Sequence, residues 1–268
     1  MVQRGMMING MSVAGATGAK KIVMTEFDKA VAALPGFKYD MDTSRDAPAG
    51  LESPFIRHAR GADSLLVAQG VGWSNVDSSH INGLPALRLD GSQQHREYMT
   101  KGLKPGAVSL MIVASLGQAI RTDAIATTKI FAAIFNGSTY IFRVRFNVTT
   151  GNLTFSVTES LAAVTVARAS LPAQDAPAIF TFCHDPSDGF ITIDINNSIR
   201  ANGTDLYTPP LSEDKPIHVG SVLAPSANQS FSGDILHVIP FEGSHIIRDA
   251  PEQFAKTILL GKAEFGIA

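Results

Sequence analysis

Two pairs of acidic residues are the first candidates for catalysis, because enzymes that hydrolyse glycosidic bonds commonly use two carboxyl groups. Residues two apart on a β-strand share a face, so a glycosidase site on a strand requires the spacing E-x-D-x-E or E-x-D-x-x-E. The sequence contains no such triplet. The nearest pairs, Asp185 with Asp188 and Asp40 with Asp42, lie among turn-forming residues. We interpret all four as turn residues and expect a protein without catalytic residues that is not an enzyme.

Cysteine and histidine do not form a reactive pattern. Cys183 is the only cysteine and lies in an apolar run, where we expect a small buried side chain. His184 is adjacent to it, and neighbours on a strand point to opposite faces, so it cannot serve as a base for the thiol. The seven histidines show none of the spacings typical of zinc sites, and we expect His237 and His245 on the polar sides of their segments. A G-x-S-x-G serine hydrolase motif is also absent from the sequence.

Three aromatic residues are candidates for binding a glycan, because sugars stack on exposed rings. Trp73 is the only tryptophan and lies in the turn-like segment 70–75, and Tyr98 and Tyr207 are weaker candidates of the same kind. The competing interpretation for Trp73 is a ring that covers the edge of the core or contacts another subunit, and we favour that interpretation.

The composition narrows the classes of partner. The chain has 268 residues, of which 45% are hydrophobic and 17% charged, so it can build a sizeable core. A net charge of −2 without a Lys/Arg cluster argues against nucleic acid and against a charged membrane surface. No apolar run is long enough to span a membrane, and the N-terminal stretch is not read as a signal peptide.

The two ends of the chain differ from its middle. Residues 1–22 are rich in small residues and predict an arm. Residues 24–34 predict a short helix with Thr25 as its cap and Pro35-Gly36 after it, which could pack on the main domain or on another subunit. Residues 36–63 are turn-rich and predict a long connection. We therefore divide the chain into an anchoring or oligomer-contacting segment, 1–50, and a β-rich domain, 51–268.

From residue 64 onward, short apolar runs alternate with turn residues, which is typical of a β-sandwich or barrel. In 140–146, Tyr140, Phe142, Val144 and Phe146 are predicted on one face and Ile141, Arg143 and Arg145 on the other, the alternation expected of an antiparallel sheet. Asn136-Gly137 and Gly151-Asn152 predict hairpin turns. The predicted fold class is all-β: an antiparallel two-sheet jelly-roll sandwich with short helices near the two ends. The predicted strands are 64–68, 86–89, 108–116, 130–135, 139–146, 153–157, 163–167, 179–183, 189–195, 217–220 and 235–241.

The stretch 231–262 changes its periodicity from strand to helix. Ile235, Val238 and Ile239 predict a buried strand. Asp249 then predicts a helix cap, and Gly261 the end of that helix. The helix is predicted to pack through its apolar face, which carries the residues Phe254, Ile258 and Leu259.

Several motifs, in this order, resemble the concanavalin A-like lectin/glucanase sandwich in its laminin-G-like form, over residues 60–268. The first motifs are an early strand, 85–91, which ends in an Asp-Gly turn, and the strand 108–115. A central hairpin, 178–195, follows; its Asn-Gly turn, Asn202-Gly203, comes after an extended segment, 196–201. The last motifs are the strands 217–220 and 231–235. A late strand followed by a loop and a short C-terminal helix resembles the members of this family found in bacteriophage virion proteins.

The resemblance implies a non-enzymatic structural component of a bacteriophage virion, for capsid decoration or tail and fibre attachment. Such a protein would form homo-oligomers, contact other virion proteins and be assembled in the host cytoplasm. The alternative is a lectin-like module that binds a host glycan or receptor. We expect no cofactor. The resemblance leaves calcium open, with Asp205, Asp234 and Asp123 as possible donors, although no D-x-D-x-D-G loop is present.

Overall fold

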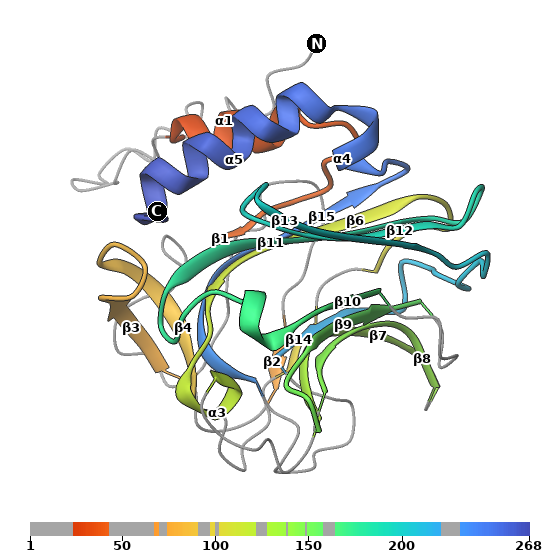
Figure 1. Ribbon diagram of the computed structural model, residues 1–268. Helices are drawn as coiled ribbons and strands as arrows, with labels where there is room; N and C mark the ends of the chain where they lie inside the picture. Colours follow the sequence, from red (N-terminus) through yellow and green to blue (C-terminus); the bar gives the residue numbers. More distant parts are fainter. Residues whose placement is uncertain are drawn as a thin grey trace, which may run out of the picture.

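The computed structural model describes residues 24–42, 67–69, 74–90, 97–99, 102–121, 128–137, 139–147, 149–157, 164–220 and 231–268. These residues form two antiparallel sheets that face each other, with helices on the outer side of the larger sheet (Figure 1). The two-sheet sandwich predicted from the sequence is thus confirmed. None of the helices in this part of the chain is both long and apolar enough to cross a membrane.

The larger sheet has eight strands and the smaller has five, and a separate ribbon pairs β2 with β5. Along the larger sheet the order is β13 (Ile199–Thr204), β12 (Phe190–Ile195), β11 (Pro177–Asp185), β6 (Val108–Ser115), β15 (Ser232–Glu242), β4 (Leu84–Asp90) and β3 (Ser74–Ser78), with β1 (Met41–Asp42) beside β15. The smaller sheet has the order β10 (Val164–Val166), β9 (Leu153–Ser156), β8 (Thr139–Phe146), β7 (Lys129–Asn136) and β14 (Ile217–Val219). The ribbon strands are Val67–Gln69 and Glu97–Met99, and the helical elements are α1 (Glu26–Ala33), α3 (Gln118–Arg121), η2 (Arg168–Ser170), α4 (Ile246–Asp249) and α5 (Pro251–Phe265).

The main core lies between the two sheets and is rich in phenylalanine. The rings of Phe131 and Phe231 stack with centroids 4.7 Å apart, and Phe180 meets Phe131 edge-on at 5.2 Å. The inward-facing residues of β12 are Ile191, Ile193 and Ile195, as the alternation predicts. Aromatic and β-branched side chains suit this position because they fill the space between two pleated surfaces.

A second core lies on the outer face of the eight-stranded sheet, where α1 and α5 lie side by side (Figure 1). Phe27 of α1 packs edge-on against Phe265 of α5, with ring centroids 4.9 Å apart. Beneath these helices, the sheet contributes apolar residues such as Ile179 and Ile239. The central strands β6, β11 and β15 are therefore buried on both faces. The helix predicted over 24–34 packs on the sandwich, and Thr25 caps it through a hydrogen bond from the Asp28 amide at 3.1 Å.

The C-terminal helix departs from the prediction at three residues, Asp249, Leu259 and Gly261. Ile235, Val238 and Ile239 are fully buried, and Phe254 and Ile258 pack inward, as expected. Leu259, however, is 67% exposed, because it lies one position past Ile258 and therefore about 100° further round the helix. Gly261 does not end the helix: α5 continues to Phe265 and ends at Gly266, which adopts the left-handed conformation. Asp249 closes the preceding turn of α4 instead, where its carboxylate accepts the His245 amide at 2.8 Å.

One turn and the faces of two residues also differ from the prediction. The β12–β13 turn is Asn196-Asn197, both with positive φ, and Asn202-Gly203 lies within β13. The β7–β8 register shifts between Ile134 and Phe135, where Ile141 of β8 is left unpaired; Tyr140 consequently lies on the outer face and Ile141 points into the core. The Asn136-Gly137 and Gly151-Asn152 turns join strands as predicted. The boundary placed between residues 50 and 51 lies outside the described residues.

Candidate functional site

The conformation of the turn between β11 and β12 is fixed by hydrogen bonds to two carboxylates of the same turn. The Asp185 carboxylate accepts the Ser187 amide at 2.9 Å, and the Asp188 carboxylate accepts the Phe190 amide at 3.0 Å. Gly189 has a φ of +72°, which favours glycine, and so turns the chain back into β12. Both aspartates act as turn residues, as predicted. Their remaining carboxylate oxygens point outward, to where other parts of the chain meet this turn.

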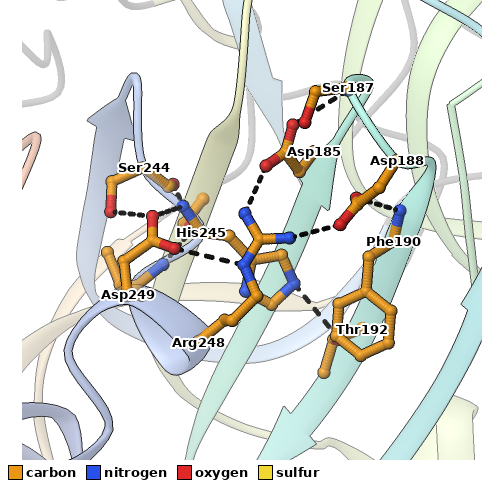
Figure 2. A network of polar contacts seen from close by, with 11 residues as sticks. Asp185, Ser187, Asp188, Phe190, Thr192, Ser244, His245, Arg248 and Asp249 are labelled. Atoms are coloured by element: carbon orange, nitrogen blue, oxygen red, sulfur yellow. Dashed lines mark hydrogen bonds and ion pairs between the residues drawn. The ribbon is translucent and has the colours of Figure 1, made fainter.

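Arg248 of α4 reaches this turn from the far end of the chain (Figure 2). Its Nη1 lies 2.7 Å from Asp188, its Nη2 bonds Asp185, and its Nε lies 3.2 Å from Asp249. Burial of Asp185 opposes its ionisation, but the hydrogen bonds from Arg248 and Ser187 outweigh burial and lower its pKa to about 2. The carboxylates of Asp185, Asp188 and Asp249 thus share one guanidinium, so negative groups outnumber positive groups in this network.

His245 lies next to this network, and its amide donates to the Asp249 carboxylate (Figure 2). Its ring is buried, lies 5.2 Å from the ring of Phe190, and has Nε2 3.3 Å from the Thr192 hydroxyl. Burial lowers the pKa of His245, so the ring is neutral near pH 7. The expected position on a polar side is therefore wrong for His245, and also for His237, which is buried against Asp40 at 3.0 Å. Asp40 is accordingly a buried hydrogen-bond partner of His237 and not a turn residue.

The loop after β13 brings Leu206 and Tyr207 to the same turn. The Asp205 amide donates to the Gly189 carbonyl at 2.7 Å, and the Tyr207 amide donates to the Asp205 carboxylate at 3.0 Å. A Cβ at Gly189 would lie 2.8 Å from the Asp205 backbone, so only glycine permits this approach. Leu206 and Tyr207 are 70% and 42% exposed, the largest exposures beside Leu259 among large hydrophobic residues of the described chain. The other carboxylate oxygen of Asp205, Oδ2, is buried without a hydrogen-bond partner.

We call this surface the β11–β12 rim. It combines an exposed aromatic ring, an exposed leucine and several carboxylates on a backbone fixed by hydrogen bonds. It consists of Asp185, Ser187, Asp188, Gly189, Asp205, Leu206, Tyr207 and Arg248.

The other predicted glycan-binding residues are not placed at this rim by the described structure. Trp73 lies outside the described residues. Tyr98 lies on β5, opposite Ala68 of β2, and its side chain is outside the described part of the structure. Sequence reasoning missed Arg248, Asp188 and Asp205 as rim residues. Only the Asp-Gly of 188–189 carries a local signal, and it is a turn signal.

The residues considered for a thiol or a metal have structural roles. Cys183 is buried beneath the helices, and burial raises the pKa of its thiol to about 12. Asp234 accepts two hydrogen bonds of 2.8 Å from Arg88 and one from Ser78. Asp123 lies outside the described residues. Within the described part of the chain, no group of three or more histidine, cysteine or acidic residues could hold a metal ion.

Comparison with known proteins places the fold. No family model matches the chain, and no curated protein sequence matches it. Among solved structures, domain 4 of an extracellular arabinanase from Geobacillus stearothermophilus, in complex with arabinotriose, matches with a TM-score of 0.60 and 12% identity over 84% of this chain and 99% of that one. The receptor-binding domain of a botulinum neurotoxin (mosaic serotype C/D) matches with a TM-score of 0.58 and 10% identity, over 84% of this chain and 50% of that one.

A third neighbour is a Trypanosoma rangeli sialidase in complex with sialic acid, with a TM-score of 0.54 and 8% identity, over 91% of this chain and 38% of that one. At these identities the likeness establishes the fold alone, a β-sandwich of two antiparallel sheets. The chain spans half or less of the neurotoxin domain and the sialidase chain, and nearly all of the arabinanase domain.

Proposed function

We propose that this protein is a non-catalytic carbohydrate-binding module whose sugar binds at the β11–β12 rim. The observation that carries the proposal is the exposed residue Tyr207, whose backbone amide donates to the Asp205 carboxylate in a loop that is bonded to Gly189, the residue after Asp188. An aromatic ring offers a flat apolar surface to the C–H face of a sugar, and carboxylates accept hydrogen bonds from its hydroxyl groups. The rim supplies both kinds of contact within one short stretch of surface.

The rim is also preorganised for such a ligand. Asp205 is bonded to the Gly189 carbonyl and to the Tyr207 amide, so the loop is ordered before a ligand arrives. A preordered loop loses less conformational entropy on binding than a flexible one. Asp205 Oδ2 is a buried acceptor without a partner, and a sugar hydroxyl would satisfy it.

The structural neighbours support the binding class by analogy of fold. The arabinanase domain holds arabinotriose and the sialidase holds sialic acid, and both share this sandwich. Analogy of fold supports a search for sugars without naming one. Against catalysis at the rim, Asp185 remains ionised above about pH 2 through its pairing with Arg248 and so is a poor general acid near neutral pH.

A glycan array with the intact chain, followed by calorimetry on each bound sugar, tests this proposal. Tyr207→Ala removes an aromatic contact of about 0.5–1.5 kcal/mol, which predicts a roughly two- to tenfold higher Kd. Leu259→Ala is the matched control, because it removes another exposed apolar side chain, on α5. The series also includes Trp73→Ala, because Trp73 is the first candidate for glycan binding that the sequence offers. The proposal fails if no sugar binds, or if Tyr207→Ala and Leu259→Ala have equal effects.

Display on a bacteriophage particle remains our proposal for where such a module works. It is supported by the C-terminal arrangement of β15 followed by α4 and α5, which resembles the phage-type sandwiches. In this role the protein would be a homo-oligomer that contacts other virion proteins and is assembled in the host cytoplasm. Mass spectrometry of purified particles from the source tests the role directly, and absence of the protein from those particles would rule it out.

A further inference from the structure

Strand β13 forms an open edge of the eight-stranded sheet. In the described part of the chain it pairs only with β12, and the register between the two strands has no shift. The Asp205 amide donates to the Gly189 carbonyl, so the odd-numbered residues of β13 direct their backbone groups toward β12. Because this direction alternates along an antiparallel strand, the backbone groups of Arg200, Asn202 and Thr204 point away from the sheet.

These outward backbone groups are open to another strand. Arg200, Asn202 and Thr204 are exposed, and no hydrogen bond from the described residues reaches their outward N–H and C=O groups. Sheets usually protect such an edge with proline, lysine, a bulge or an inward-pointing charge. The sequence of β13, IRANGT, has none of these features. Its one charged residue, Arg200, donates from Nε to Asp194 of β12 at 2.9 Å and is thereby turned back over the sheet.

The inner face of β13 holds the strand in place. Ile199 and Ala201 are partly buried and pack against the main core. Val164 of β10 lies beneath Gly203, where an added Cβ would come within 2.9 Å of the valine side chain. The edge is therefore ordered before a partner arrives, and an ordered strand loses less conformational entropy on pairing than a flexible one.

The strand is complementary to a second copy of itself. In an antiparallel pair centred on Asn202, this residue would face Asn202 of the second copy, and Arg200 of each copy would face Thr204 of the other. All three outward residues would then form hydrogen-bonded pairs, and no like charges would face each other. The two arginines would be four residues apart along the ribbon, about 13 Å, which exceeds the Debye length of about 10 Å in 0.1 M salt.

We propose that β13 is a dimerisation edge, where two copies of this chain join their eight-stranded sheets into one continuous antiparallel sheet. The contact is isologous, so association through this strand stops at two copies. Leu206, which is 70% exposed, lies two residues after Thr204 and would face Ser198 of the second copy, so the dimer would cover part of its apolar surface. A second copy is favoured over a foreign peptide because β13 faces itself without a charge conflict and without an unpaired outward group.

The dimer would carry two β11–β12 rims. In this register, Leu206 of one copy and Leu206 of the other are eight residues apart along the joined strands, which corresponds to about 26 Å. A glycan long enough to reach both rims should therefore bind the dimer more tightly than the monomer. This consequence rests on the proposed sugar site, whereas the dimer itself does not.

Sedimentation velocity of the intact chain over a wide range of concentrations tests the dimer. A small interface predicts a dimer that dissociates on dilution. Asn202→Pro removes the outward amide donor and breaks no backbone bond to β12, and it should raise the dimer Kd about tenfold or more. Asn202→Ala is the matched control: it loses the hydrogen bond that Asn202 accepts from Thr192 but keeps the amide, so its dimer Kd should be nearly unchanged.

A pair of charge variants tests the register. Thr204→Lys places a positive charge opposite Arg200 of the other copy at both ends of the paired strands, and it should weaken the dimer several-fold. Thr204→Glu places a negative charge there and should strengthen the dimer. Both effects should decrease as salt is raised. Opposite signs at one exposed position would not result from a loss of folding, so this series remains decisive if Asn202→Pro folds poorly.

Amide exchange supplies a local measurement of the same contact. Exchange in 199–204 should slow as the concentration of the wild-type protein rises, and it should not slow in Asn202→Pro. The proposal would be overturned by a monomer at all concentrations, by equal effects of Asn202→Pro and Asn202→Ala, or by open-ended assembly beyond two copies. Loss of sugar binding in Tyr207→Ala with an intact dimer, or a dimer that binds no sugar, concerns the rim alone and is distinguishable from these results.

Discussion

At the scale of single residues, Asp185 shows how a carboxylate in a turn becomes part of a wider network. Its own turn requires one oxygen, which accepts from Ser187, and the second oxygen recruits Arg248 from 63 residues away. The pair fixes α4 against the β11–β12 turn, beside the loop that carries Tyr207. A change at this pair should therefore affect both stability and the shape of the rim.

The acid stability of the protein should depend on Asp185. Its pKa in the folded state, about 2, lies below the ordinary value of 3.8, so the ionised form stabilises the fold above about pH 4. This contribution is lost as the pH falls from about 4 to 2. Because Arg248 is partly exposed, we expect Asp185→Asn to lower the free energy of unfolding by about 1 kcal/mol at pH 7 and by nothing near pH 2.

Urea unfolding between pH 2 and pH 7 measures this difference. Glu252→Gln, at an exposed position in the first turn of α5, is the control and should show no such convergence with the wild type. A difference between Asp185→Asn and the wild type that stays constant over the whole pH range would contradict the assignment.

Gly261 is the second residue with a specific structural requirement. A Cβ at this position would lie 2.6 Å from Ile179 Cδ1 and 2.9 Å from the ring of Phe27. Gly261→Val should therefore destabilise the protein by about 1–3 kcal/mol through overpacking, although glycine is itself unfavourable in a helix. Leu259→Val introduces the same branched side chain on the exposed face of α5 and should cost less than about 0.5 kcal/mol. Thermal unfolding of both variants tests this contrast, and equal Tm values would show that the helix can move away from the sheet.

At the scale of elements, the turn between β12 and β13 shows why the predicted hairpin was displaced. Both Asn196 and Asn197 have positive φ, a conformation that asparagine tolerates, in the three-residue turn between the paired residues Ile195 and Ile199. The Asn196 side chain also accepts the Ile179 amide at 2.7 Å, and the Asn197 amide donates to Asp194 at 2.8 Å. These contacts favour a turn at Asn196-Asn197. Asn202-Gly203, six residues later, instead pairs with β12 and forms part of β13.

Asn196→Ala should consequently destabilise the hairpin. The variant loses a hydrogen bond to a partly buried amide and places a non-glycine residue without a polar side chain in the left-handed region, at a combined cost of about 2 kcal/mol. Asn196→Gly retains the conformation and loses only the hydrogen bond, so its cost should be about half as large. Chemical denaturation measures both, and an Asn196→Gly variant as unstable as Asn196→Ala would refute the conformational part of the argument.

The elements divide clearly into those that sequence could predict and those it could not. Strands such as β8, β11 and β12 have alternating or continuous apolar residues, and their positions follow from that pattern. β3 and β13, with the sequences SNVDS and IRANGT, lack the pattern and become strands because neighbouring strands pair with them. The predicted face of Tyr140 was wrong because the extra residue in β8, Ile141, which shifts the β7–β8 register, has no local signature in the sequence. The rim could not be predicted as a unit, because α4 and β11 meet only through tertiary packing.

At the scale of the whole molecule, the helices convert a two-layer sandwich into three layers (Figure 1). The eight-stranded sheet is covered on both faces in its centre, by the smaller sheet and by α1 with α5. The five-stranded sheet packs against the main core with one face, and its other face holds a small buried cluster of Ile130, Ala133 and Phe135. The sheet that is covered on both faces supplies residues to both larger cores, so its central strands should be the most stable part of the molecule.

This division predicts a gradient of amide hydrogen exchange. Amides in β6, β11 and β15 are hydrogen-bonded to strands on both sides and buried on both faces, so they should exchange only through global unfolding. Amides of the edge strands β10 and β13 need only a local opening and should exchange orders of magnitude faster. Exchange mass spectrometry with a bound sugar adds a spatial test: a rim ligand should slow exchange in 186–190 and 205–208 and leave 140–146 unchanged. Slowing confined to 140–146 would contradict the rim as the binding site, because that strand belongs to the five-stranded sheet and the rim lies on the eight-stranded one.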